Sequence, residues 1–220
     1  MAAGPGLVAR MRFTDRHDGD FSVDRPERLL RRARESVADH PWTWLRQVHG
    51  ATVVAVASPG AAAGSRADAS VTGALDAVLA VQTADCAPVV LVGTGAVGVA
   101  HAGWRGLVAG VIPAAVAALA ELDAGDIRAV IGPLIRPDRY EFEERELALV
   151  ADRAGEQVRA RTLEGRPALD LAAAVSSVLN RAGVTDIDDL GLDTAEPEYF
   201  SHRCRGDTGR QVSSVCLESR

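Results

Sequence analysis

A pair of apolar runs joined by a glycine turn constrains the fold more than any other feature of this sequence. Residues 88–92 and 96–100 are short apolar runs, and the turn Gly93-Thr94-Gly95 separates them. Such a pattern is typical of a β-hairpin that is buried in a core. We therefore expect a buried antiparallel hairpin, with Cys86 just before its first strand and His101 at the end of its second.

Helical and strand-like patterns are mixed along the rest of the chain. Helices are expected at residues 23–39, 107–122, 143–160 and 170–182. Further strands are expected at residues 42–48, 52–57, 76–83 and 127–131, and as two short pieces within residues 198–216. This order lacks the regular alternation that builds a Rossmann sheet, and it favours an α+β fold in layers. The 220 residues, 47% of them hydrophobic, predict one domain that spans residues 1–220.

The charge of the chain limits its partners. A formal net charge of −6 argues against nucleic acid or an anionic membrane surface as the main partner. All 24 basic residues are arginine, which excludes Schiff-base chemistry on lysine and a P-loop lysine. A phosphate bound to this chain would be held by arginine, by backbone amides or by a metal.

The sequence predicts a cytoplasmic protein. No apolar run approaches the roughly 20 residues that cross a bilayer, and residues 1–16 show no signal-peptide pattern. The three cysteines, an odd number, favour free thiols in a reducing compartment over disulfides. Their thiols are then available as metal ligands or nucleophiles.

His49, Cys86 and His101 each stand at the edge of an apolar segment. Two imidazoles and a thiolate form the three-ligand set that leaves one position of a catalytic zinc ion vacant. The gaps between them are too long for a site built from local loops, but they suit strands that converge at one end of a sheet. Taken singly, each residue is more often structural, as a turn histidine or a small buried hydrophobe. Ligand softness and the small number of histidines favour zinc, with copper as the other candidate.

Two motifs give the chain a family resemblance. Thr-Ala-Asp-Cys-Ala-Pro at residues 83–88 and His-Ala-Gly-Trp-Arg-Gly at residues 101–106 resemble those of the YfiH family, formerly called laccase-domain or multicopper polyphenol oxidase proteins. The resemblance begins at Asp68 and also covers residues 46–50, 131–133, 140–142, 170–171, 199–203 and 208–211. It implies an α/β/β/α layered sandwich with mixed sheets, and His49, Cys86 and His101 as metal ligands.

The same resemblance implies an activity. It implies that the chain, like members of the YfiH family, cleaves adenosine, inosine and methylthioadenosine with phosphate and deaminates adenosine as a second reaction. Purine nucleosides and phosphate are then the expected small-molecule partners, and the three metal ligands are also the expected catalytic residues.

Five further residues are predicted to act at this site. Asp85, beside the predicted thiolate, is expected to transfer a proton or to orient an imidazole, although it could equally cap the turn. Arg46 and Arg105 adjoin the predicted ligands and could hold phosphate, with surface ion pairs as the alternative. Gln47 and His202 are the remaining predicted substrate contacts.

Three other functions stay open. A metal-free cysteine hydrolase would use Cys86 as nucleophile and His49 or His101 as base. A copper-dependent polyphenol oxidase is disfavoured, because a laccase-type cluster needs many more histidines than the five in this chain. A non-catalytic purine-binding module would bind the same ligands without turnover. The oligomeric state is left open by the sequence.

Overall fold

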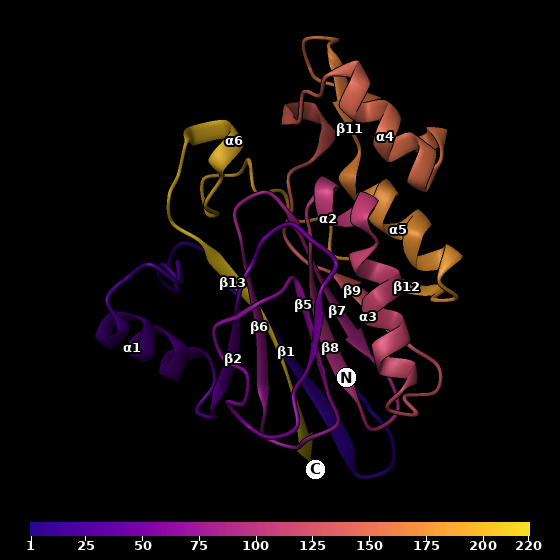
Figure 1. The fold of residues 1–220 in the computed structure, drawn as a ribbon. Helices are drawn as coiled ribbons and strands as arrows, with labels where there is room; N and C mark the ends of the chain where they lie inside the picture. Colours follow the sequence, from indigo (N-terminus) through magenta and orange to yellow (C-terminus); the bar gives the residue numbers. More distant parts are fainter.

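Two mixed β-sheets pack face to face and carry helices on their outer surfaces (Figure 1). The computed structural model describes all residues from 1 to 220. Helix α1 (Glu27–Val37) covers the five-stranded sheet. Helices α3 (Val111–Ala120), α4 (Glu144–Ala154) and α5 (Leu171–Arg181) lie on the side of the six-stranded sheet. The predicted α/β/β/α layered sandwich is therefore confirmed.

The five-stranded sheet brings the two ends of the chain together. Its strands, in spatial order, are β1 (Leu7–Phe13), β13 (Gln211–Ser219), β6 (Val78–Thr83), β2 (Trp42–Arg46) and β4 (Ser65–Arg66). Strands β1 and β13 are antiparallel, with Leu7 opposite Ser219, whereas β2 runs parallel to β6. In Figure 1, β13 runs from the end of the molecule near α6 (His202–Arg205) down to the C-terminus.

The six-stranded sheet contains the predicted hairpin. Its strands, in spatial order, are β12 (Asp186–Asp189), β9 (Arg128–Ile131), β7 (Ala87–Val92), β8 (Val97–Ala102), β5 (Ala69–Thr72) and β3 (Val53–Ala55). Strands β7 and β8 are antiparallel, with Pro88 opposite His101. Val89 and Leu91 pack toward the helices, and Val90 packs toward the other sheet. Burial of both faces explains why this hairpin is apolar at almost every position.

A short helix and a small sheet complete the fold near the hairpin. Helix α2 (Trp104–Ala109) follows β8 directly, and the chain then enters α3. Strands β10 (Arg159–Arg161) and β11 (Pro167–Leu169) form a separate antiparallel pair, and two 3₁₀ turns lie at Pro137–Arg139 and Glu156–Val158. No helix in the structure is both long and apolar enough to serve as a membrane-spanning segment.

Glycines interrupt two of the predicted helices. The predicted helix at 107–122 is instead α2 and α3, which meet at Gly110 with a φ of +97°. The predicted helix at 143–160 ends at Ala154, because Gly155 has a φ of +103°. A residue in this left-handed region cannot continue an α-helix, and glycine adopts it without a Cβ clash. Both predictions were right in type and wrong in extent.

The strand predictions differ from the structure near both ends of the chain. The sequence does not predict β1, which pairs with β13 across nearly the whole chain. The segment 198–216 contains α6 and the long β13 rather than two short strands. The predicted strands at 42–48 and 52–57 are confirmed as β2 and β3, which lie in different sheets. Strand pairing over such sequence distances depends on the assembled core, which a local pattern does not record.

Candidate metal centre

Three side chains from separate parts of the chain meet at one end of the two sheets. His49 lies in the loop after β2, Cys86 immediately precedes β7, and His101 lies in β8. One donor atom from each lies within 4.8 Å of the other two, and Sγ of Cys86 is 3.9 Å from Nε2 of His49. The imidazole rings are 4.8 Å apart in an edge-to-face arrangement. The structure thus brings together the complete predicted ligand set.

A buried carboxylate positions both histidines. Asp68 is fully buried, and its Oδ1 lies 2.9 Å from Nδ1 of His101. The same carboxylate accepts hydrogen bonds of 2.8–3.2 Å from the backbone N–H groups of Val48, His49 and Gly50. These bonds hold His49 at a left-handed φ of +57°. Because an ionised carboxylate only accepts hydrogen bonds, Nδ1 of His101 carries the proton and Nε2 is free for a metal.

The donor set fits a zinc ion. Zinc bonds to nitrogen and sulfur are about 2.0–2.3 Å long, which places the ligand atoms roughly 3.5 Å apart. Donors that lie within 4.8 Å of one another are already close to that spacing. Gly103 keeps the adjacent space open, because a Cβ there would lie 2.8 Å from Sγ of Cys86 and 3.0 Å from Cδ2 of His49. His49, Cys86 and His101 are therefore able to hold the metal together.

Without a metal, the site contains a thiolate paired with an imidazolium. Burial raises the pKa of the Cys86 thiol, but the adjacent His101 and His49 outweigh it and lower the pKa to about 6. Burial lowers the pKa of His101, but the Cys86 thiolate and the Asp68 carboxylate outweigh it and raise the pKa to about 9. Burial also raises the pKa of Asp68, yet hydrogen bonds from His101 and the backbone hold that pKa below its usual value. The thiolate is therefore formed at neutral pH.

The three donors line a cavity of about 550 Å³. This volume lies in the range of small-molecule binding sites. The lining includes four of the other five predicted site residues, Gln47, Asp85, Arg105 and His202. Arg46 lies outside the lining, and its exposed guanidinium group is 5.6 Å from the ring of Trp44. A substrate contact by Arg46 stays a prediction that this position does not support.

Asp85 directs its carboxylate toward the C-terminal segment. It accepts hydrogen bonds from the hydroxyl groups of Thr194 and Ser201, at 2.8 and 2.7 Å, and from the backbone N–H of Arg203 at 2.6 Å. Asp85 itself is buried, so these donors compensate the desolvation of its charge. The contacts favour a positioning role for Asp85, and direct proton transfer by this residue stays a prediction.

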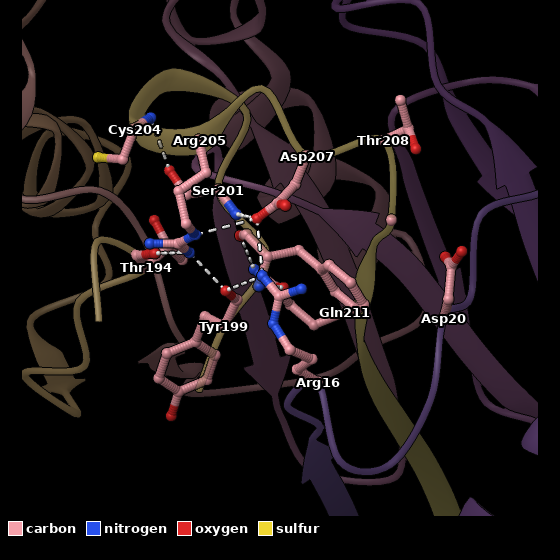
Figure 2. A network of polar contacts seen from close by, with 12 residues as sticks. Arg16, Asp20, Thr194, Tyr199, Ser201, Cys204, Arg205, Asp207, Thr208 and Gln211 are labelled. Carbon is pink, nitrogen blue, oxygen red and sulfur yellow. Dashed lines mark hydrogen bonds and ion pairs between the residues drawn. The ribbon is translucent and has the colours of Figure 1, made fainter. Parts of the chain in front are cut away.

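Two arginines hold the segment around α6, which contributes His202 and Arg203 to the lining of the cavity (Figure 2). Asp207 accepts hydrogen bonds from the guanidinium groups of Arg16 and Arg205, at 2.7 and 3.1 Å, and from the backbone N–H of Ser201 at 2.9 Å. Arg205 also donates to the backbone carbonyl of Tyr199, and so does Arg16. We call these contacts the Asp207 clamp. The clamp and Asp85 together hold both ends of the short helix α6.

The polar side chains of the lining differ in how many hydrogen bonds they already form within the protein. The side-chain amide of Gln47 exchanges two hydrogen bonds, of 2.7 and 2.8 Å, with the backbone of Gln82. In contrast, the hydroxyl group of Thr83 is buried and has no partner within the protein. Thr83 therefore keeps an unpaired hydroxyl group beside the cavity, and the amide of Gln47 keeps one N–H and one lone pair for a ligand.

Comparisons with known proteins agree with the fold and with the motifs. The sequence profile described as "Multi-copper polyphenol oxidoreductase laccase" matches residues 12–218. The chain belongs to this laccase family. The proteins YlmD from Geobacillus stearothermophilus and YfiH from Bacillus licheniformis, both solved structures, each superpose with a TM-score of 0.83 at 26% sequence identity. The superpositions cover 100% and 94% of this chain, and 94% and 92% of those chains.

Two sequence relatives of this chain have names that refer to nucleosides. A purine nucleoside phosphorylase from Streptomyces coelicolor is 44% identical over 181 residues, which is 80% of this chain and 74% of that relative. A purine nucleoside phosphorylase from Deinococcus radiodurans is 37% identical over 226 residues, which is 100% of this chain and 86% of that relative. The predicted family membership is therefore confirmed.

The name of the laccase family refers to several copper ions, but this member gathers few copper ligands. His49, Cys86 and His101 form the one cluster of three or more metal-binding side chains in the structure. His17, His40 and His202 are outside this cluster. A laccase-type centre requires more imidazoles than the two found here, so the geometry counts against the copper oxidase alternative.

In metal-free protein at pH 7, we expect iodoacetamide to modify Cys86 at least about tenfold faster than Cys216. At pH 7 the solution is above the pKa of Cys86, which is about 6, so its thiolate forms. Burial raises the pKa of Cys216 to about 12, so that thiol stays protonated. Timed labelling followed by peptide mass spectrometry measures both rates. Added Zn²⁺ should protect Cys86 and leave the exposed Cys204 unaffected. Labelling of Cys86 that is insensitive to zinc would contradict coordination by its thiolate.

Replacing Gly103 with alanine should weaken zinc binding about tenfold, as changes beside metal ligands commonly do. The added Cβ would lie 2.8 Å from Sγ of Cys86, so the thiol must move. Competition with a chromophoric chelator measures the affinity. Gly50→Ala is the matched control, because its Cβ would meet its nearest neighbours at 3.6 Å. Equal zinc affinities in the two variants would show that the space beside the thiol is unimportant.

Proposed function

We propose that this member of the laccase family is a metal-dependent purine nucleoside phosphorylase. Its proposed substrates are adenosine, inosine and methylthioadenosine with inorganic phosphate, and deamination of adenosine is a proposed second reaction. The observation that carries the proposal is the convergence of His49, Cys86 and His101 on the wall of a cavity of about 550 Å³. The names of two relatives, 44% and 37% identical to this chain, support the class of reaction.

Zinc is the proposed metal, because a thiolate and two imidazoles form a donor set that it favours. A bound zinc ion would supply a Lewis acid at the cavity wall. In phosphorolysis, a phosphate oxygen forms a bond to C1′ of the ribose while the bond between C1′ and N9 breaks. The electron pair of the broken bond leaves with the purine, and the purine takes up the proton that the hydrogen phosphate loses when it becomes the ester. In the proposed reaction the residues that line the cavity hold the phosphate and the nucleoside close together, which makes the step effectively unimolecular.

The test is the conversion of inosine and phosphate to hypoxanthine and ribose 1-phosphate, followed by chromatography. Protein treated with a chelator should lose the activity, and Zn²⁺ should restore it. Omission of phosphate should abolish the release of hypoxanthine, which distinguishes phosphorolysis from hydrolysis. Turnover that survives complete removal of metal would reject the metal-dependent mechanism.

A metal-free cysteine hydrolase is the second candidate, and the charge state of the site favours it specifically. The thiolate of Cys86 beside a protonated His101 is the pairing that activates a nucleophilic cysteine. Elemental analysis of freshly purified protein, combined with mass spectrometry during turnover, separates the two candidates. Absence of zinc together with a covalent adduct on Cys86 would support the hydrolase.

A further inference from the structure

Two arginines flank a row of aromatic side chains beside the candidate metal centre. The guanidinium group of Arg105 lies 4.2 Å from the ring of Trp104, and that of Arg203 lies 5.0 Å from the ring of Tyr140. Phe142 connects the two rings edge to face, at 5.6 Å from Trp104 and 5.0 Å from Tyr140. This aromatic row holds two planar cations at its ends, and both arginines line the cavity.

Both arginines keep hydrogen-bonding capacity for a ligand. Arg203 forms no ion pair with a carboxylate, and a single contact of 3.0 Å joins its guanidinium group to the backbone carbonyl of Glu141. Arg105 has Glu146 at 3.9 Å, and the two side chains are 61% and 38% exposed. An exposed ion pair at that distance contributes little. Most of the N–H donors of both guanidinium groups are therefore free.

Tyr140 adds a third donor between these cations. It is 6% exposed and lines the cavity, and its hydroxyl group has no hydrogen-bond partner in the protein. Burial raises the pKa of Tyr140, Cys86 and Asp85 raise it further, and the charges of Arg203 and Arg105 oppose the rise. The hydroxyl group thus stays protonated at neutral pH and can donate a hydrogen bond.

The backbone holds Arg203 in place independently of its side chain. Its N–H donates to the buried carboxylate of Asp85 at 2.6 Å, and the N–H of Cys204 donates to Oγ of Ser201 at 3.1 Å. The Asp207 clamp fixes the following residues of the same segment (Figure 2). A binding group on a segment that is already ordered loses little conformational entropy when a ligand arrives.

We propose that Arg203, Arg105 and Tyr140 form the subsite that binds the phosphate co-substrate. This inference rests on the proposed function and adds residues that the sequence does not identify, since Arg203 and Tyr140 are absent from the predicted substrate contacts. Guanidinium groups bind phosphate oxygens in a bidentate manner, and the tyrosine hydroxyl supplies a further donor. In a chain with a net charge of −6, this local pair of cations gives the anion a favourable environment.

The test uses the zinc-loaded full chain and inorganic phosphate as the probe. Calorimetry should show that Arg203→Gln weakens phosphate binding at least about tenfold, which is the loss of one charge-assisted contact. In steady-state assays the same variant should raise KM for phosphate and leave KM for inosine within about twofold. Arg203→Lys should recover part of the affinity, because lysine keeps the positive charge but lacks the parallel N–H donors of a guanidinium group. Tyr140→Phe should weaken phosphate binding by a smaller factor.

Arg139→Gln is the matched control, since Arg139 is exposed, precedes Tyr140 and lies outside the cavity lining. It should bind phosphate like the wild type. Unchanged phosphate affinity in Arg203→Gln, or a loss that appears in Arg46→Gln instead, would overturn the subsite. If the wild type binds phosphate through Arg203 but turns over no nucleoside, the subsite stands and the proposed function fails.

Discussion

The Cys86→Ala variant should lose its metal and turn over inosine at least about a thousandfold more slowly than the wild type. The thiolate is the one anionic ligand among the three donors, and its removal leaves two neutral imidazoles. A Lewis acid is worth several kcal/mol of transition-state stabilisation, and about 4 kcal/mol corresponds to a factor of a thousand in rate. Metal content by mass spectrometry and hypoxanthine release by chromatography measure the two effects.

Cys204→Ala is the control for this experiment. Its thiol is exposed and lies outside the cavity lining, so the variant should keep the metal and the activity of the wild type. Full activity in Cys86→Ala would reject both the metal-dependent mechanism and the cysteine nucleophile. Loss of activity in Cys86→Ala, with no metal in the active wild type, would leave the cysteine hydrolase as the explanation.

The Asp68→Asn variant should lower zinc affinity by about 10–100-fold, the range seen when a hydrogen-bond partner of a ligand is lost. It should also lower the free energy of unfolding by about 2–3 kcal/mol, because buried hydrogen bonds to a charged group are lost. The neutral amide places an N–H₂ group where the native carboxylate accepts from His101 and from three backbone N–H groups. Chelator competition and denaturant titration measure the two effects.

The stability effect of Asp68→Asn should depend on pH. The native pKa of Asp68 is held below its usual value, so the stabilisation is present above the unfolded pKa of about 3.9. It is lost as the pH falls through the lower native pKa. The difference in free energy of unfolding between wild type and variant should thus be widest near neutral pH and narrow below pH ~4.

Asp123→Asn is the control for the carboxylate. Asp123 is exposed in a turn with a φ of +54°, a conformation that asparagine also adopts readily. It should unfold like the wild type and bind zinc equally well. If Asp68→Asn also binds zinc like the wild type, the carboxylate is not needed to orient His101.

The hairpin shows what a local pattern predicts well. An apolar run, a glycine turn and a second apolar run specify β7 and β8 with little ambiguity, because both faces of these strands are buried. The same reasoning places Cys86 and His101 at adjacent strand ends. Helix α5 confirms the helix predicted at 170–182, and Asp170 caps its first turn by accepting a hydrogen bond from the N–H of Ala173.

The roles of Asp68 and Arg203 could not be predicted from the sequence. Asp68 begins the run that carries the family resemblance, yet nothing in its neighbours indicates a contact with His101, 33 positions further along the chain. The buried contact between Asp85 and Ser201 spans 116 positions. A lone acidic or basic residue in a sequence is most often a solvated surface group, so neither position stands out before the fold is known.

The sequence by itself determined the family, the layered α+β class and the three side chains of the candidate metal centre, because motifs and apolar runs are properties of neighbouring residues. Only the tertiary structure decided which charged groups serve the site. In the fold, Asp68 is buried against His101, and Asp85 accepts hydrogen bonds from the segment around α6. Arg203 lines the cavity, whereas Arg46 lies outside it. The pairing of β5 with β8 carries Asp68 to His101, and the pairing of β13 with β6 carries the segment before β13 to Asp85. Each buried charge thus finds its partner through strands that are far apart in the chain.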